Sequence, residues 1–388
     1  MGRKYKIISG DGHIETPPEP WVARVAEEHR NRAPRLVRLP EGQGDAWVVE
    51  GMGILHTGQN ITGRGPVRFA HASYFDDDGN PAEGTGDAVS RLREQDLDGI
   101  DAELLFPPVF ATRFITGISD REAYLAMVQG YNTFLAEDYC SVAPDRLLGA
   151  AFIPICGIDD AIAELKRARE LGLAAVCLQA FPNGSGGPTP DDDRFWETAL
   201  EMGMPISPHI TFGDTAGPPP KGPAPSDAKV ASGMTQHVGG VAPGYTMAQL
   251  IIDGVFERFP ELKFHFAEIN CATLPSMLFY MDRDFDGYND WFQVKLPKPP
   301  SQYFYDDCLM GMIREPLALH MGEFMPLEWF AWASDFPHSV GTYPNSVAYI
   351  EESFAHLDPA LTQRIVRDNI AEFLGLDLDA DITETPAA

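Results

Sequence analysis

Short apolar runs alternate along most of the chain with longer stretches in which apolar residues recur every three or four positions. The short runs predict strands at residues 5–9, 101–106, 146–153, 173–179, 204–210, 262–268, 303–310 and 327–335. The longer stretches predict helices at residues 87–99, 121–140, 159–172, 193–203, 245–260 and 274–288. Such alternation is typical of parallel strands joined by right-handed crossovers. Eight such strands can close into a (β/α)8 barrel, and an open doubly wound sheet is the alternative.

Two long segments interrupt this alternation. Residues 36–87 are rich in glycine and contain scattered aromatic residues, and residues 211–245 are rich in proline and glycine. Segments of this length without a helix or strand pattern usually either cover a site or lack fixed structure. Because they contain His56 and His237, we expect them to be lids that touch a ligand, one after strand 1 and one after strand 5.

The composition narrows the class of protein. The chain has 388 residues, 44% of them hydrophobic, which suits one large α/β barrel or two medium domains. We expect one domain at residues 1–376 and a polar tail at 377–388. The formal charge of −28 argues against nucleic-acid and anionic-membrane partners, and no apolar run reaches the length of a membrane span. Five cysteines without a C-x-x-C pair suit a reducing compartment, so we expect a cytoplasmic protein.

Residues with metal-ligand chemistry follow the predicted strands. Asp11 and His13 lie two residues apart after the first strand, and this spacing lets both side chains point to one face. His209 ends the fifth predicted strand and Asp335 ends the eighth. In a closed barrel these strand ends meet at the functional face. Carboxylate and imidazole together suit zinc, manganese or iron better than calcium or magnesium, so the pattern predicts one divalent metal ion there.

Other residues near these strand ends leave alternatives open. Glu268 follows the sixth strand and is either a ligand or proton carrier, or one half of a structural ion pair. His338 either contacts substrate or orients Asp335. Arg113 is a candidate carboxylate clamp or an ordinary surface arginine. Strand alternation places His265 on the face opposite to Glu268, where it is expected to pack.

Several sequence motifs together resemble a known family. The H-E-x-x-H, G-x-S-x-G and P-loop patterns are absent from the chain. The segments that do carry a resemblance are DGHIETPPEPW, RLREQDLDGIDAELLFP, GVFERFPELKFHFAEINCATLPSML, WASDFPHSVGTYPNS and DNIAEFLGL. They resemble motifs of the amidohydrolase-2 family, which includes aminocarboxymuconate-semialdehyde decarboxylase and γ-resorcylate decarboxylase. The resemblance covers nearly the whole chain and implies a distorted (β/α)8 TIM barrel with a mononuclear metal site.

The resemblance also implies roles for individual residues. Asp11 and His13 match the first metal pair of the family, and His209 matches the ligand after strand 5. Asp335 matches an aspartate that faces the metal and handles protons. Glu268 stands where the best-known decarboxylases have a histidine and other branches have a glutamate, which leaves the reaction open. Members of the family form homodimers or higher homo-oligomers, and we expect the same here.

These observations lead to one main functional hypothesis and two alternatives. Phe212 and other phenylalanines after strands 2, 4 and 5 predict an apolar pocket that suits a small aromatic or unsaturated acid. We expect metal-dependent, non-oxidative decarboxylation, with zinc favoured over manganese or iron and with Asp335 delivering a proton. The alternative enzyme is a hydrolase or hydratase that uses Asp335 as a general base at the same site. The third hypothesis is a small-molecule-binding barrel without turnover.

Overall fold

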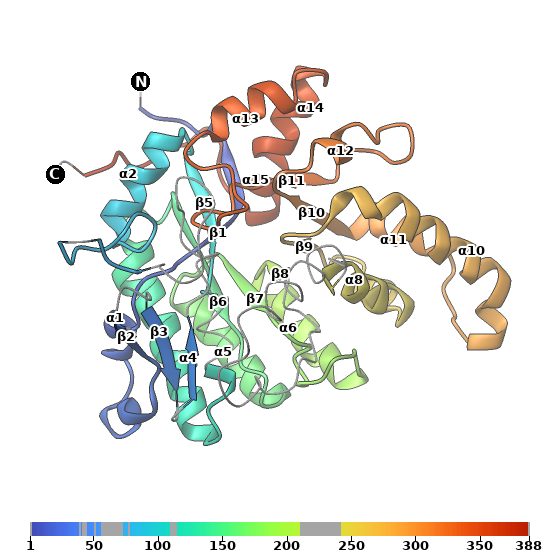
Figure 1. The fold of residues 1–388 in the computed structure, drawn as a ribbon. Helices are drawn as coiled ribbons and strands as arrows, with labels where there is room; N and C mark the ends of the chain where they lie inside the picture. The colour runs from blue at the N-terminus through green and yellow to red at the C-terminus, as the bar shows by residue number, and fades with distance from the viewer. Residues whose placement is uncertain are drawn as a thin grey trace.

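A barrel of parallel strands forms the centre of this computed structural model, which describes residues 2–38, 40, 45–49, 52–55, 73–76, 78–108, 115–209 and 242–386 (Figure 1). The eight barrel strands within these residues are β1 (Ile8–His13), β5 (Ala102–Phe106), β6 (Leu147–Phe152), β7 (Ala175–Leu178), β8 (Ile206–Pro208), β9 (Phe264–Phe266), β10 (Cys308–Met312) and β11 (Phe330–Trp332). Each pairs in parallel with the next. A parallel bridge between Gly12 and Phe336 brings β1 next to the segment after β11, so the sheet is nearly closed. The predicted (β/α)8 barrel is confirmed and the open sheet is wrong.

Helices cover the outside of this barrel. Those of eight or more residues are α2 (Ala88–Asp98), α4 (Arg121–Phe134), α5 (Ile158–Glu170), α6 (Asp193–Met202), α8 (Ala242–Ile252), α10 (Leu274–Phe292), α11 (Pro300–Asp307) and α13 (Ser346–Ser353). The shorter ones are α1 (Glu19–Val22), α9 (Val255–Arg258), α12 (Pro316–Leu319), α14 (Pro359–Gln363) and α15 (Asn369–Leu374). Among the described helices, none is both long and apolar enough to cross a bilayer.

The predicted element boundaries are close to the observed ones, with one clear error. Residues 303–310 were expected to be a strand, but residues up to Asp307 belong to α11 and only Cys308 begins β10. Pro300 occupies the first turn of α11, where proline is tolerated, and buried Tyr303, Phe304 and Asp307 follow a helical spacing. A proline start signal therefore outweighs the short apolar run that suggested a strand.

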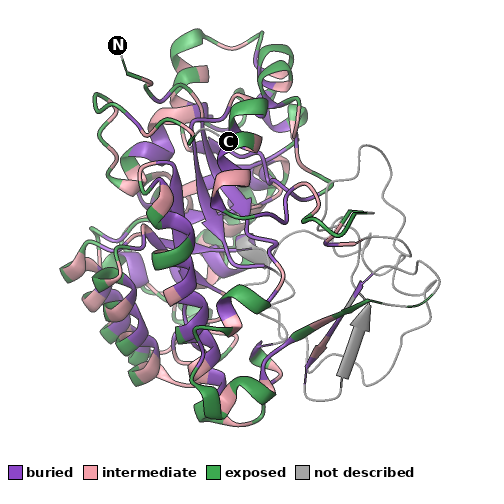
Figure 2. Cartoon of the chain, turned by 90° about the vertical axis from the view of Figure 1, so that its left-hand side faces the viewer, coloured by how far each residue is buried: buried purple, intermediate pink, exposed green. Residues whose placement is uncertain are grey.

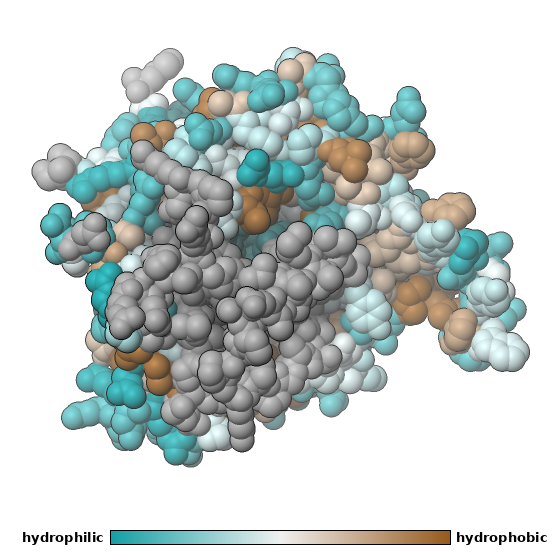
Figure 3. All heavy atoms as spheres, viewed as in Figure 1, coloured by the Kyte–Doolittle hydropathy of each residue, from teal (hydrophilic) through white to brown (hydrophobic). Residues whose placement is uncertain are grey.

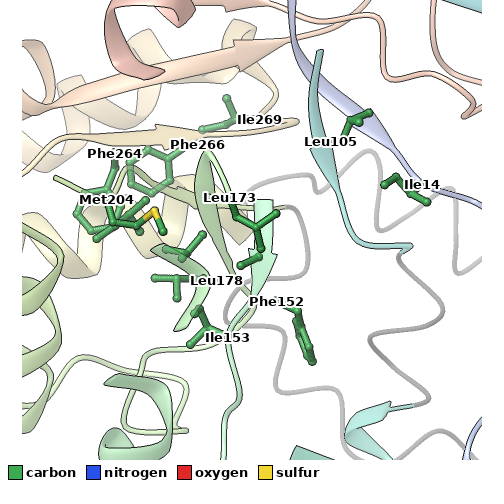
Figure 4. Packing of buried hydrophobic residues seen from close by; sticks show 14 of the residues in the cluster. Ile14, Leu105, Phe152, Ile153, Leu173, Leu178, Met204, Phe264, Phe266 and Ile269 are labelled. Carbon is green, nitrogen blue, oxygen red and sulfur yellow. The ribbon is translucent and has the colours of Figure 1, made fainter. Parts of the chain in front are cut away.

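Two apolar layers follow from strand alternation. Leu104 and Phe106 of β5 point into the barrel, where the strands also contribute mostly small residues such as Ala150 and Ala331. Leu105, between them in sequence, belongs to the layer that packs strands against helices. Figure 4 shows Phe264, Phe266, Met204 and Leu178 packing in that outer layer, and Figure 2 shows the buried strands at the centre of the molecule. The functional groups therefore emerge at the end of the barrel rather than through its wall.

The first irregular segment contains regular structure. Its described part forms an antiparallel sheet of β2 (Arg35–Arg38), β3 (Asp45–Val49) and β4 (Met52–Leu55), beside the barrel in Figure 2. The expectation that this segment lacks strands was wrong, because each strand is too short to show a periodic pattern in the sequence. Trp47 donates a hydrogen bond to the Tyr74 hydroxyl (2.9 Å), which donates to Glu15 (3.2 Å). These bonds tie the small sheet to the chain that leaves β1.

Candidate metal centre

Within the described residues, carboxylates and imidazoles from three strands converge at the carboxyl end of the barrel. Asp11 and His13 alternate along β1, and both side chains are fully buried. His13 Nε2 lies 3.4 Å from Asp11 Oδ1 and 3.6 Å from Asp335 Oδ1. His209, directly after β8, places its Nε2 3.4 Å from Asp11 Oδ2. The structure thus brings together the four residues that the sequence nominated as metal ligands.

Two acidic residues reach this cluster through unusual backbone geometry. Glu268 and Asp335 adopt left-handed conformations with φ of 52° and 54°. Residues other than glycine adopt this region infrequently, and such outliers concentrate at functional sites. Glu268 Oε2 lies 3.8 Å from His209 Nε2. The left-handed turns therefore aim both carboxyl groups at the cluster after their strands have ended.

His265 also points inward, contrary to the prediction that it lies on the face opposite to Glu268. A Cβ atom added to Gly10 of β1 would lie 3.3 Å from its Nε2, and one added to Gly311 of β10 would lie 3.1 Å away. The ring of His265 therefore crosses the barrel interior. Alternation predicts the wrong face for Glu268 because the strand ends before it and its backbone is left-handed. His265 contacts Ser207 Oγ through its Nδ1 (2.9 Å), so it packs in the interior as expected.

The hydrogen-bonding state of the cluster indicates what it can bind. His13 Nδ1 lies 3.2 Å from the carbonyl oxygen of Pro107. A carbonyl only accepts, so Nδ1 carries the proton and Nε2 presents a lone pair to the carboxylates. Burial, followed by nearby His338 and His209, lowers the pKa of His13 well below its ordinary value, which keeps the ring neutral. Both carboxylate oxygens of Asp11, His13 Nε2 and His209 Nε2 are buried and have no hydrogen-bond partner among the described residues.

This arrangement fits a divalent cation. One ligand atom from each of Asp11, His13, His209 and Glu268 lies within 4.8 Å of the others, and His13, Asp335 and His338 form a second such group. Ligands about 2.0–2.2 Å from a tetrahedral ion lie roughly 3.3–3.6 Å apart, which matches the contacts given above. Acceptor atoms that face one another repel, and a cation between them converts the repulsion into coordination. The hydrogen bond from His13 Nδ1 to a backbone carbonyl is the usual support of a metal-binding histidine.

The neighbouring acids carry shifted pKa values. Burial raises the pKa of Asp335, and contact with His338 opposes the rise. Burial, then the charges of Asp335 and Asp11, raises the pKa of Glu268 well above its ordinary value. Burial opposes charge on His338, but Asp335 and Glu15 outweigh it and raise the pKa of His338 well above its ordinary range. His338 Nδ1 lies 3.0 Å from Asp335 Oδ1, so the imidazolium and carboxylate form a buried pair at the site.

A buried arginine, to which the sequence gave no role, supports the site from below. Arg91 of α2 contacts Glu103 of β5 (2.7 Å) and donates to the carbonyl oxygens of His13 (3.0 Å) and Phe336 (2.9 Å). It therefore joins β1 to the turn that carries Asp335. A Cβ atom at Gly12 would lie 2.8 Å from the Arg91 guanidinium, so glycine is needed there. The detectable sequence signal was Glu103, a charge within the otherwise apolar run AELLF.

Four predicted site residues lie outside the described residues, and one buried residue near the site was not predicted. Arg113, His56, His237 and Phe212 lie outside the described residues, as do most of the two proposed lids. Glu15, which received no role from the sequence, has its Oε1 3.6 Å from His338 Nε2 and is buried. Glu15 therefore belongs to the surroundings of the His338–Asp335 pair.

Comparison with known proteins places the chain in a family. Residues 69–297, more than half of the chain, match the family described as Amidohydrolase (Amidohydro_2). A γ-resorcylate decarboxylase of Rhizobium sp. (strain MTP-10005) is 27% identical over 234 residues, which cover 56% of this chain and 64% of the relative. The match thus spans less than two thirds of that relative.

Two solved structures share the fold. An amidohydrolase from Mycobacterium avium subsp. paratuberculosis K-10 has a TM-score of 0.68 and 18% identity over 96% of this chain and 99% of its own. A manganese complex of 5-carboxyvanillate decarboxylase from Novosphingobium aromaticivorans DSM 12444 has a TM-score of 0.59 and 18% identity, covering 74% of this chain and 79% of its own. With this fold and the family match, the chain belongs to the amidohydrolase family.

Proposed function

We propose that this protein is a metal-dependent, non-oxidative decarboxylase of an aromatic or unsaturated carboxylic acid. The observation that carries the proposal is the cluster of buried side-chain atoms of Asp11, His13 and His209 that have no hydrogen-bond partner among the described residues and are spaced as ligands of one divalent cation. The similarity to a γ-resorcylate decarboxylase supports the choice of reaction. We favour zinc because two imidazoles and carboxylates suit it, and manganese or iron also suits this donor set.

The protein side chains have clear tasks in such a reaction. Direct loss of carbon dioxide would leave an unstabilised carbanion, so the carbon that bears the carboxylate must first gain a proton. A bound cation supplies Lewis-acid attraction for substrate oxygens. The His338 imidazolium, 3.0 Å from the Asp335 carboxylate, passes its proton to this group, whose pKa is raised by burial, and Asp335 then delivers the proton to the carbon. After proton transfer the carbon–carbon bond breaks, its electron pair returns to the unsaturated system, and carbon dioxide leaves.

A hydrolase or hydratase is the second candidate, and Glu268 favours it. This carboxyl group lies within the set of possible ligands, 3.8 Å from His209 Nε2, and its pKa is raised well above the ordinary value. It can therefore act as an additional ligand or a second proton carrier. In this mechanism Asp335 takes a proton from water instead of giving one to carbon.

Assays in ¹⁸O-labelled water distinguish the two reactions. We would load the protein with zinc, manganese or iron and supply 2,6-dihydroxybenzoate and 5-carboxyvanillate as probes. Decarboxylation predicts carbon dioxide release and one solvent hydrogen on the ring, and Asp335→Asn should abolish both. Incorporation of ¹⁸O into product without gas would establish the hydrolase instead. A chain that binds no stoichiometric metal, and does not change on His209→Ala, would favour a binding protein without turnover.

The remaining assignments belong to the same proposal. Arg113, His56, His237 and Phe212 contact the substrate, with Arg113 gripping its carboxylate. The lids enclose the pocket, and the protein works in the cytoplasm as a homodimer or higher homo-oligomer. Alanine substitution of Arg113 should raise KM for carboxylate substrates more than it lowers kcat.

A further inference from the structure

Helix α10 exposes an unusual number of large aromatic side chains. It extends away from the barrel in Figure 1, and hydrophobic residues gather on this projecting side in Figure 3. The exposed fractions are 63% for Phe279, 49% for Tyr280, 55% for Tyr288, 83% for Trp291 and 68% for Phe292. Scattered single apolar residues are normal on a surface, but a contiguous group usually marks an interaction site. We call these five residues the α10 aromatic surface.

The α10 aromatic surface is distinct from the side of the helix that packs on the protein. Leu274 and Leu278 are the buried residues of α10. Tyr288 and Trp291 follow Tyr280 by eight and eleven positions. These spacings are close to two and three helical turns, so the three residues lie on one face of the helix. The neighbouring helix α8 extends the surface, because Gly244 of α8 packs against Met277 and the adjacent Tyr245 is 63% exposed.

The size of this surface fits a stable interface. Each aromatic side chain offers about 150–250 Å². The five residues of the α10 aromatic surface and Tyr245, which are 49% to 83% exposed, together provide roughly 500–900 Å², close to the ~800 Å² that each partner buries in a standard interface. This area begins in the upper part of the range of the largest apolar patch on a typical monomer, about 300–600 Å², and extends beyond it.

The spacing of the exposed aromatic residues along α10 fits a second copy of this chain as the partner. A two-fold axis that crosses α10 between Phe285 and Asp286 relates Phe279-Tyr280 of one copy to Trp291-Phe292 of the other. In a two-fold antiparallel pairing, Tyr280 of one copy therefore meets Trp291 of the other, and Phe279 meets Phe292.

The central positions of α10 also match in this pairing. Arg283 meets Tyr288, so its guanidinium, which already lies 4.6 Å from the Tyr280 ring, can stack on aromatic rings of both copies. Asp284 meets Gly287 instead of another acid. A side chain at Gly287 would have no atom of its own subunit within 4 Å, so this position is open to a close helix crossing.

We propose that two copies of the protein associate through their α10 aromatic surfaces in an antiparallel, two-fold arrangement. The proposal gives a surface to the oligomer proposed above and does not depend on which reaction the site performs.

Mass measurements on the full chain test the proposal. Light scattering after size exclusion should give an even multiple of the 42.7 kDa chain. Tyr280→Asp with Trp291→Asp should raise the dissociation constant at least 100-fold and shift the mass toward the smaller species. Circular dichroism and zinc content should not change. The matched control is Phe324→Asp, at a residue that is 71% exposed near α12, and it should leave the mass unchanged.

Cross-linking tests the antiparallel register. A mixture of Tyr280→Cys and Trp291→Cys proteins should give a mixed disulfide dimer on oxidation, in preference to either protein alone. A monomeric wild-type protein, or an oligomer that keeps its mass after both aspartate substitutions, would overturn the proposal. An oligomer of the expected kind without decarboxylation would refute the proposed reaction and leave the interface standing.

Discussion

Two buried polar clusters lie near the place where β1 meets the segment after β11, and they differ in how their groups are paired. In the first, Glu103 accepts hydrogen bonds from Arg91 (2.7 Å), Gln95 (2.8 Å) and Ser334 (3.1 Å), so the buried charge is fully matched by donors. In the second, Asp11 and His13 bring acceptor atoms together without donors between them. A complete network stabilises the fold without help, whereas a set of acceptors stores repulsion until a cation binds. We therefore regard the Glu103 network as structural support and the Asp11–His13 cluster as the candidate site.

Breaking the complete network should have the largest effect on stability. Arg91→Met leaves the Glu103 carboxylate buried without its main partner, which typically costs roughly 3–5 kcal/mol. Urea unfolding of the metal-free protein measures the loss. Arg93→Met on the same helix removes an exposed arginine and should change the unfolding free energy little. Glu103→Met added to Arg91→Met should recover part of the loss, and equal destabilisation by Arg91→Met and Arg93→Met would contradict this account.

Removing a carboxylate from the metal cluster should not destabilise the metal-free protein, in contrast to the Arg91 substitution. Asp11→Asn relieves repulsion, so it should not lower the stability of the metal-free protein. Zinc at 100 times its dissociation constant should stabilise the wild type by about 2.7 kcal/mol and the variant by almost nothing. Thermal unfolding with and without zinc measures both effects. Equal stabilisation of the two proteins by zinc would place the ion elsewhere.

Glu94 lies at the edge of the Arg91 network, and its carboxyl group is less well compensated than that of Glu103. Burial raises its pKa to about 7, although it accepts a hydrogen bond from the Gly84 N–H (2.7 Å). A carboxyl with a raised folded-state pKa destabilises the fold once it ionises, so stability should fall as pH rises from about 4.5 to about 7. Glu94→Gln should therefore gain about 1–2 kcal/mol at pH 8 and little at pH 4. Exposed Glu122→Gln serves as control, and a gain independent of pH would contradict the assignment.

The smallest effect is expected for a hydrogen-bonded pair in the barrel interior. Ser207 donates to the carbonyl oxygen of His265 (2.7 Å) and contacts His265 Nδ1 (2.9 Å). Burial lowers the pKa of His265 to about 4, so the ring is neutral at physiological pH. Ser207→Ala should cost about 1 kcal/mol of unfolding free energy and leave zinc affinity unchanged. A changed zinc affinity would show that this pair belongs to the metal cluster.

Local sequence patterns were enough to predict the barrel and the first pair of candidate site residues. Apolar periodicity is a local property, so it located seven of the eight barrel strands within a few residues and six of the eight described helices that have eight or more residues. The spacing of Asp11 and His13 followed from the same local rule, since alternate residues of a strand share a face. Arg91 and Glu103 both belong to the motif RLREQDLDGIDAELLFP, but no local sequence pattern predicts which charged residue pairs with which.

The rest of the candidate site depends on contacts that form when the chain folds. Glu268 and Asp335 reach the cluster through left-handed backbone, which the identity of a carboxylic acid does not predict. Arg91 joins His13 to Phe336, residues more than three hundred positions apart, and His338 meets Glu15 over a similar separation. Such contacts exist only after the barrel closes, because each depends on the packing of many strands and helices at once. Local periodicity specifies which residues form an element, and the closed barrel specifies which of their side chains meet.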